Sequence, residues 1–336
     1  MRKPRVSTPS YKVLAAEPRG KLANLIELNQ ICRKTLSVRF KVFFDRFVSA
    51  KDVWRVLPPI LTRTKANGCD PWILAIDGKW LHRNGVVMIY RDITHSENIF
   101  WSYHTSESYS AIYFDLKALL GLLTADGDAN SNCLPSGVIS DWKGSIVSGV
   151  RDYLGDIPHQ RCLAHVVREA KRFLPKGSSF RAVLVLREIA KELPYIKTKK
   201  EVAGWKAELI RWETAYDCLL KERTYSQTEV TKTGSRWWYT HGNLRRAWHL
   251  LTNNWYPFFV HIDHNLLPNT NNSVEGVNCQ LKNKLLNHRG MKTPQQVSFL
   301  FWYLSFTRTK TKQSLKKLWD EWKTGKSSEK ATGNVT

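Results

Sequence analysis

A short and almost continuous apolar run begins at residue 72 and reads Trp72-Ile73-Leu74-Ala75-Ile76-Asp77-Gly78. Apolar runs of this length are typical of strands that are buried on both faces of a sheet. A second run of the same kind, Gly137-Val138-Ile139-Ser140-Asp141, follows further along the chain. The two runs predict two buried strands, each with a carboxylate projecting at its end.

The segments around these runs predict a mixed sheet that is flanked by helices. Strands are expected at 85–92, 98–104 and 158–163, and helices at 108–123, 143–154 and 165–174. Strands joined by short turns and then alternating with helices are the order of an α/β domain with a mixed sheet. The predicted fold class is therefore α/β.

The rest of the chain has a helical pattern. The block from about residue 180 to 259 contains no convincing strand, and it is rich in tryptophan: Trp205, Trp212, Trp237, Trp238, Trp248 and Trp255. We expect this block to be an all-α insertion. Helices are also expected at 273–287 and from 294 to about 322, and basic helices precede the first strand between residues 22 and 47.

These patterns divide the chain into five regions. They are a basic helical region at 1–65, the first part of the α/β core at 66–178, the all-α insertion at 179–264, the last part of the core at 265–323 and a disordered tail at 324–336. The helices of the first region could read DNA as a helix-turn-helix, or they could pack on the core as a helical pair.

The charge of the chain favours a polyanionic partner. Its 52 Lys and Arg against 29 Asp and Glu give a formal net charge of +23, for which nucleic acid is a better candidate than an acidic membrane surface. Residues 71–161 are the exception, with 7 basic residues against 10 acidic ones. Carboxylates concentrated there suggest cations held beside a phosphate backbone, although a solvated acidic surface explains the same count.

Cysteine usage and hydropathy point to a protein that stays in the compartment where it is made. The six cysteines include no C-x-x-C pair, so reduced thiols are expected instead of a zinc ribbon or a disulfide framework. No apolar run approaches the roughly 18–20 residues of a membrane span, and the start of the chain lacks the apolar stretch of a signal peptide. We expect a cytoplasmic, nucleoid-associated protein in a prokaryote and a nuclear protein in a eukaryote.

The two strand carboxylates suggest a metal site. Two carboxylates from adjacent strands, with a third from a packed helix, can hold two divalent cations about 3.5–4 Å apart, the arrangement that serves phosphodiester displacement. Mg²⁺ suits such a site because it prefers hard oxygen ligands. A single Asp at the end of a strand is more often a turn or helix cap, so the pair carries the prediction.

Four motifs share one family resemblance. They are Ile76-Asp77-Gly78, Ile139-Ser140-Asp141, Gln160-Arg161-Cys162-Leu163-Ala164-His165, and Thr270-Asn271-Asn272-Ser273-Val274-Glu275-Gly276-Val277-Asn278 with Leu281-Lys282. Together, over roughly residues 70–305, the chain resembles the DDE transposases of the mutator-like superfamily and their bacterial insertion-sequence relatives. The third and fourth motifs are the most specific.

The resemblance implies an RNase H-like sheet interrupted by a helical insertion, with Asp77, Asp141 and Glu275 as catalytic metal ligands. It implies two Mg²⁺ ions, with Mn²⁺ as a substitute. The implied activity is metal-dependent DNA strand cleavage and strand transfer, without a covalent protein–DNA intermediate. The implied partners are the terminal inverted repeats of a transposon, target DNA and further copies of the chain in a dimer or larger assembly.

Cys162 and His165 match the C-x-x-H motif of this family. One Cys and one His do not complete a zinc site, because four ligands are usual. We favour a structural role, or the positioning of Asp141 or of the scissile phosphate, over direct metal ligation. His165 could also be an ordinary core histidine.

Candidate DNA contacts lie in the insertion and after Glu275. They are Arg161, Arg236, Trp237, Trp238, Arg245, Arg246, Asn278, Lys282, Lys284, His288 and Arg289. The tryptophans could stack on flipped or single-stranded bases, and the basic side chains could hold phosphates. The alternatives are that the tryptophans form a core and that the basic residues form a solvated face.

Two other function classes stay open. One is a catalytically inactive or domesticated transposase that only binds DNA, which the presence of all three acidic residues disfavours. The other is a structure-selective nuclease on the same fold, which the helical insertion and the Asn271-Asn272 motif disfavour. The first 65 residues contain no metal-ligand cluster of the kind that recognises transposon ends in many relatives.

Overall fold

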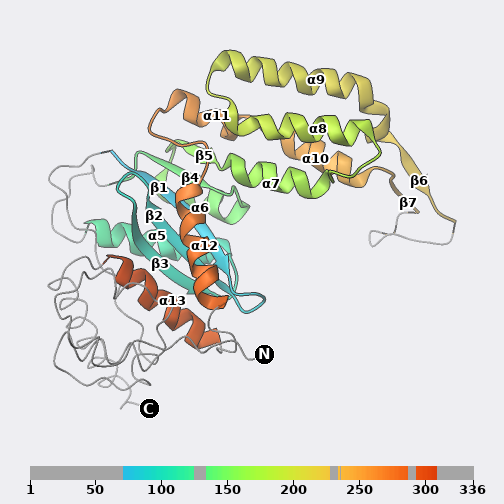
Figure 1. Ribbon diagram of the computed structural model, residues 1–336. Helices are drawn as coiled ribbons and strands as arrows, with labels where there is room; N and C mark the ends of the chain where they lie inside the picture. Colours follow the sequence, from blue (N-terminus) through green and yellow to red (C-terminus); the bar gives the residue numbers. More distant parts are fainter. Residues whose placement is uncertain (1–70, 125–133, 228–233, 235, 287–292, 309–336) are drawn as a thin grey trace, which may run out of the picture. The chain divides into compact units, whose positions relative to one another are not determined.

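The computed structural model describes residues 71–124, 134–227, 234, 236–286 and 293–308 (Figure 1). These residues form a mixed α/β structure with one five-stranded sheet and one two-stranded sheet. The basic helices expected in residues 1–65 and the tail expected at 324–336 lie outside the described residues, as do the candidates His288 and Arg289.

The main sheet has the strand order β3-β2-β1-β4-β5. Its strands are β1 (Ile73–Trp80), β2 (Val86–Asp92), β3 (Glu97–His104), β4 (Gly137–Ser140) and β5 (His159–Arg161). Strand β4 is parallel to both β1 and β5, whereas β2 and β3 are antiparallel. The prediction of a mixed sheet is therefore confirmed. The buried residues Ile73–Ile76 and Val138–Ile139 explain why both runs are almost continuously apolar.

The sequence pattern predicted that strand β1 ends at Asp77, and this prediction is wrong. The strand pairs with β4 only from Ile73 to Ile76 and then continues to Trp80. The continuation lies beside β2, since a Cβ atom on Gly78 would come within 2.9 Å of Val86. Asp77 therefore lies inside a strand, at the first position beyond its pairing with β4.

The helices of the α/β region follow the predicted order. They are α5 (Tyr109–Thr124), α6 (Gly144–Leu154), α7 (Leu163–Phe173), α12 (Asn272–Leu286) and α13 (Thr293–Arg308). Ser108 caps α5 as expected, because its Oγ accepts a hydrogen bond from the Ala111 backbone N–H at 3.2 Å. Residues 309–322 of the last predicted helix lie outside the described residues.

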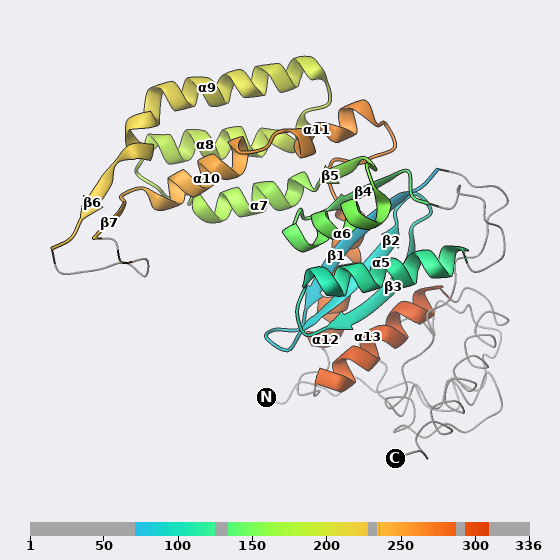
Figure 2. The ribbon, with the colours of Figure 1, turned by 180° about the vertical axis from the view of Figure 1, so that it is seen from behind.

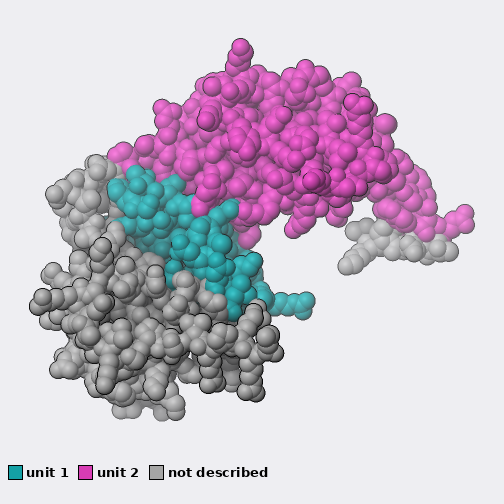
Figure 3. Space-filling view, in the orientation of Figure 1, with its two compact units in different colours: residues 1–70, 77–134, 273–336 teal, residues 71–76, 135–272 magenta. Residues whose placement is uncertain are grey.

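The chain divides into two compact units, coloured separately in Figure 3. Unit 1 contains residues 77–134 and the chain from Ser273 onward, and unit 2 contains residues 71–76 and 135–272. In unit 1, helices α5 and α12 cover opposite faces of strands β2 and β3 (Figures 1 and 2). Helix α13 packs on β3, where the rings of Phe301 and Trp101 meet edge to face at 6.5 Å.

Unit 2 contains a helical block with its own core. The block includes α8 (Arg181–Glu192), α9 (Lys199–Lys221), α10 (Gly242–Thr252) and α11 (Tyr256–Asp263). Its core includes Trp205, Trp212 and Trp248, and the last two rings stack at 5.0 Å. Gln160 of β5 joins the block to the sheet, because its side chain donates to Phe258 O and accepts from His261 N.

The expectation of an entirely helical block is wrong at one place. Residues Arg223–Tyr225 and Trp237–Tyr239 form two short antiparallel strands, β6 and β7. Both segments consist of aromatic, β-branched and arginine side chains, which favour strands when they do not belong to a helical core. The sequence pattern did not indicate these strands, because Trp237 and Trp238 lie in the chain between tryptophans of α9 and α10 that do have helical spacing.

Candidate functional site

Asp77 is a buried carboxylate with defined partners on both oxygens. Its side chain is only 6% exposed. Oδ1 accepts a hydrogen bond from the Gly78 backbone N–H at 2.9 Å, and Oδ2 accepts one from Nδ2 of Asn278 at 2.8 Å. Since neither donor carries a charge, the negative charge of Asp77 is oriented by these bonds but not neutralised by them.

Asp141 directly follows the last residue of strand β4. In the parallel pairing of β1 with β4, Ile76 is the register partner of Ser140. Asp77 directly follows Ile76 in the chain, and Asp141 directly follows Ser140. The side chain of Asp141 is mostly buried, and its Oδ2 lies 3.3 Å from Nζ of Lys143. A cation therefore already lies beside this carboxylate.

The backbone turns sharply after Asp141. Trp142 has a φ of 68°, in the left-handed region that a bulky side chain rarely adopts. Its backbone N–H donates to Oγ of Ser140 at 3.2 Å, and its ring lies 4.7 Å from that of His159. The turn separates the end of β4 from the start of α6. Strained turns of this kind are found disproportionately at functional sites.

The start of α12 is bonded to the same end of the sheet. The Cys162 backbone N–H donates to Ser140 O at 2.8 Å, and the Leu163 N–H donates to Asn269 O at 2.9 Å. The thiol of Cys162 is fully buried and accepts a hydrogen bond from the Asn271 N–H at 3.2 Å. Asn271 directly precedes α12. Within unit 2, the carboxyl ends of three parallel strands and the chain that enters α12 therefore form one junction.

Glu275 lies in the first turn of α12. It precedes Asn278, the residue bonded to Asp77, by three positions, so the two side chains are on the same face of the helix. Within unit 1, α12 is thus bonded through Asn278 to the β1 strand that carries Asp77. Asn271, the residue before α12, is held by its backbone N–H, which donates to Cys162 Sγ.

The structural role preferred for Cys162 is consistent with its burial and its bond to Asn271. His165 lies in the first turn of α7, one helical turn from the Cys162 that precedes this helix. Three residues, Cys162, Leu163 and Asn271, therefore link α7 to the chain entering α12. The C-x-x-H motif lies at this link.

Lys79 is a site residue that sequence reasoning missed. It follows Asp77 by two residues in the same strand, so both side chains lie on one face of β1. Burial lowers the pKa of Lys79, and repulsion from Lys282 lowers it further, while the charge of Asp77 raises it. Lys282 is an exposed residue of α12. The positive charge of Lys79 therefore lies near Asp77, and that of Lys282 lies near Lys79, so the two cations together can attract a phosphate.

Arg161 is more buried than a surface DNA contact. Its side chain is 16% exposed, lies 3.8 Å from Glu169 and packs over the ring of Phe258. Burial lowers its pKa, whereas the charges of Glu169 and Asp141 raise it. In this position Arg161 links β5 to α7 and α11, and most of its side chain is covered.

His159 connects the strand end to its surroundings in an uncharged form. Its Nε2 lies 2.8 Å from Oγ of Ser140, and burial lowers its pKa from 6.5 to about 4. Because the unfolded chain binds a proton more readily between these values, the stability contributed by neutral His159 is complete above pH 6.5. It is lost progressively as the pH falls to about 4.

We expect this titration to be measurable. The free energy of unfolding should fall by about 3 kcal/mol between pH 6.5 and 4 on account of His159 alone. Urea unfolding of the wild type and of His159→Gln at several pH values isolates this contribution as the difference between two slopes. Parallel pH profiles for the two proteins would refute the assignment of a neutral, partly buried His159.

Asn278 is expected to act as a positioning residue. Asn278→Ala removes a side-chain donor to Oδ2 of Asp77. If Asp77 is a metal ligand, as the family resemblance implies, metal-dependent activity should fall by about 10- to 100-fold, as it usually does when a bond to a metal-ligating group is lost. The apparent affinity for Mg²⁺ should fall with it, which a merely structural role would not produce. Asn283→Ala, at an exposed position of the same helix, is the control.

The other candidate DNA contacts fall into two groups. In α12, Asn278 is bonded to Asp77, Lys282 is exposed and Lys284 belongs to the described backbone. In unit 2, Arg236 and Trp238 are exposed on or beside β7, whereas Trp237 is partly buried. Arg245 lies over the ring of Tyr239, and Arg246 is bonded to Asn243.

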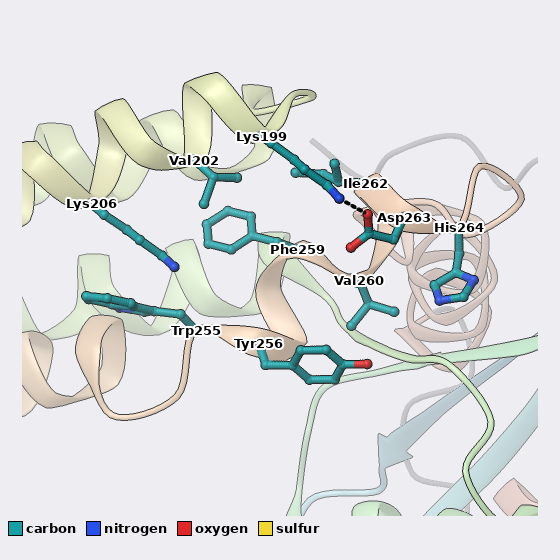
Figure 4. A pocket seen from close by; sticks show the side chains of 10 residues that line it. All are labelled: Lys199, Val202, Lys206, Trp255, Tyr256, Phe259, Val260, Ile262, Asp263 and His264. Carbon is teal, nitrogen blue, oxygen red and sulfur yellow. Dashed lines mark ion pairs between the residues drawn. The ribbon is translucent and has the colours of Figure 1, made fainter.

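A pocket of about 230 Å³ lies between α9 and α11 (Figure 4). Lys199 and Asp263 form an ion pair of 2.7 Å at its edge, and Nζ of Lys206 lies 4.6 Å from the ring centre of Trp255. None of the predicted catalytic residues lines it. The candidate site is therefore the junction at the strand ends and not this pocket.

Comparison with known proteins gives no assignment, since no family model and no curated protein matches the chain. Among the described residues, every helix is too short or too polar to span a membrane.

Proposed function

We propose that the chain is a DDE transposase that cleaves DNA at transposon ends and transfers the cleaved strands to target DNA. Asp77, Asp141 and Glu275 are its catalytic carboxylates. One observation carries this proposal. Ile76 and Ser140 are register partners in the parallel pairing of β1 with β4, and each of them directly precedes one of the two aspartates.

The topology supports an RNase H-like core. The strand order β3-β2-β1-β4-β5, with β1, β4 and β5 parallel and β3 antiparallel to β2, is compatible with such a core. The helical block with its own hydrophobic core lies in the chain between β5 and α12, where the insertion is expected. Its two short strands do not alter that position.

The residues fit divalent cations of the Mg²⁺ type. All three side chains offer carboxylate oxygens, the hard ligands that Mg²⁺ prefers, and Mn²⁺ accepts the same donors. Lys143 at 3.3 Å from Asp141 shows that this carboxylate already accommodates a positive charge. When bound, two such ions would activate an oxygen nucleophile and stabilise the leaving oxygen.

Side chains and backbone groups of the protein orient the catalytic carboxylates and attract the DNA backbone. Gly78 N–H and Asn278 fix the two oxygens of Asp77, and the junction of Cys162 with Asn271 fixes the start of the helix that carries Glu275. Lys79 and Lys282 attract the DNA backbone to this face. In cleavage, water oxygen bonds to the scissile phosphorus and the 3′-oxygen leaves; in transfer, that 3′-hydroxyl bonds to a target phosphorus and displaces its 3′-oxygen.

Metal dependence tests the proposal. End DNA of the element that encodes the chain, labelled on one strand, should be nicked at the element boundary with Mg²⁺ or Mn²⁺ and not with EDTA. Binding of the same DNA should persist in EDTA. Boundary cleavage that is equally fast without divalent metal would contradict the proposal.

A further inference from the structure

The strands β6 and β7 form a two-stranded ribbon that extends from the ends of α9 and α10, away from the helices of the block (Figure 1). None of its residues belongs to the hydrophobic core cluster of unit 2. Tyr225 is 71% exposed and Trp238 is 38% exposed. A ribbon that buries so little contributes little to folding, and its aromatic and basic side chains need another explanation.

We propose that this ribbon, with Arg223, Arg236 and Trp238 as its contact residues, lies in a groove of double-stranded DNA. A two-stranded β-ribbon is one of the two elements that fit the major groove, the other being an α-helix. This inference rests on the proposed function only in that the substrate is DNA, since the ribbon contributes no catalytic group.

On one face of the ribbon, two arginines stack on aromatic rings, Arg223 from β6 itself and Arg245 from helix α10. Arg223 lies opposite Tyr239 in the strand register, and Tyr225 lies opposite Trp237. The guanidinium of Arg223 is 4.1 Å from the ring centre of Trp237, and that of Arg245 is 4.1 Å from the ring centre of Tyr239. Stacking on a ring holds a guanidinium in place and leaves N–H donors at its edge for phosphates or guanine.

The other face is polar and exposed. Thr224 pairs with Trp238 in the register, and Ser226 N–H donates to Arg236 O, so Arg236 and Trp238 lie on this same face. The hydroxyl groups of Thr224 and Thr240 are bonded to each other at 2.8 Å. Both faces of the ribbon thus present an arginine and an aromatic ring.

The charge of the ribbon favours a polyanion as its binding partner. The residues from Arg223 to Gln227 and from Arg236 to Thr240 include two arginines and no acidic residue. The adjoining Glu222 is paired with His241 at 3.1 Å, which places that carboxylate beside a local partner. A polyanion complements this surface, whereas an apolar protein partner would leave the arginines without counterions.

Duplex DNA fits better than single strands. Base stacking in a single-strand site uses the open faces of aromatic rings. Here Arg223 lies over Trp237 and Arg245 over Tyr239, so both of those rings already carry a guanidinium on one face. For Trp237, the expectation of stacking on flipped bases is therefore replaced by a role, shared with Tyr239, in supporting an arginine.

The test is DNA binding without divalent metal. A fluorescein-labelled duplex of the element end and the single strand of the same sequence are titrated with wild type, Arg223→Ala/Arg236→Ala and Trp238→Ala. The double variant should bind the duplex about tenfold more weakly near 0.1 M salt, and the slope of log affinity against log salt should fall by about two. Trp238→Ala should weaken the duplex more than the single strand.

A matched control removes the same charge elsewhere in unit 2. Lys191→Ala/Arg211→Ala deletes two exposed cations, each of which is paired with a glutamate on its own helix. It should change neither affinity nor salt slope appreciably. Equal losses in the control and the ribbon variant, or unchanged duplex binding by a ribbon variant with a wild-type melting temperature, would overturn the proposal.

Groove placement and catalysis are separated by two further readouts. Methylation of guanine N7, which lies in the major groove, should interfere with binding of the wild type and no longer interfere at the ribbon contacts of the double variant. If the ribbon variants bind the duplex normally and metal-dependent cleavage persists, the groove-binding role of the ribbon is refuted and the proposed catalysis is not. If carboxylate variants lose cleavage but still bind through the ribbon, the groove-binding role of the ribbon is supported.

Discussion

Asp141→Asn is expected to abolish metal-dependent DNA cleavage. Asparagine keeps the size of the side chain and an oxygen that can accept the hydrogen bond from the Lys143 N–H. It removes the negative charge that binds a divalent cation. Because the cation contributes several kcal/mol to stabilisation of the transition state, the rate should fall by at least about 1,000-fold. Asp77→Asn and Glu275→Gln should have effects of the same size.

DNA binding separates this effect from misfolding. Each carboxylate variant should bind end DNA as tightly as the wild type or more tightly, since it has lost a charge that repels phosphates. Asp152→Asn, at an exposed position of α6 beside Arg151, removes the same charge outside the site and should cleave normally. Undiminished cleavage by Asp77→Asn, Asp141→Asn or Glu275→Gln would remove that residue from the site.

Trp212→Ala is expected to be the most destabilising of the tryptophan substitutions in the helical block. The ring is 3% exposed, stacks on Trp248 at 5.0 Å and donates from Nε1 to Ala182 O at 2.9 Å. Removing it leaves a cavity among α8, α9 and α10 and deletes the hydrogen bond to Ala182 O. The free energy of unfolding should fall by about 3–5 kcal/mol, as measured by urea denaturation followed by circular dichroism.

Trp238→Ala is the matched control for the same residue type. Trp238 is 38% exposed and belongs to the ribbon, so the free energy of unfolding should change by less than about 0.5 kcal/mol. The two variants should therefore exchange roles, with Trp212→Ala losing stability and Trp238→Ala losing affinity for DNA. Equal destabilisation by both would show that the ribbon is part of the folding core.

Much of the α/β region could be predicted because its signals are local. The runs ending at Ile76 and Ser140 are apolar since those strands are buried on both faces, and Ser108 is a recognisable cap. These signals gave the strand order along the chain and the mixed sheet. They also gave the two aspartates, because each follows the last residue of a parallel pairing.

The rest depends on contacts between distant residues. The bond from Asn278 to Asp77 joins positions 201 residues apart, and no local pattern indicates it. Lys79 was missed because β1 was expected to end at Asp77, whereas its pairing along β2 carries it to Trp80. The ribbon was missed because composition alone does not distinguish Trp237 and Trp238 from the core residues Trp212 and Trp248.

Strand transfer from precleaved DNA tests the central claim most directly. End DNA that already carries a free 3′-hydroxyl is incubated with the protein, a target plasmid and Mg²⁺, and joined products are resolved on a denaturing gel. We predict covalent joining of the labelled 3′ end to target DNA, and its loss in Asp77→Asn, Asp141→Asn and Glu275→Gln. Bound DNA without joined product in Mg²⁺ or Mn²⁺, or joining of an end that carries a 3′-deoxy terminus, would contradict the account.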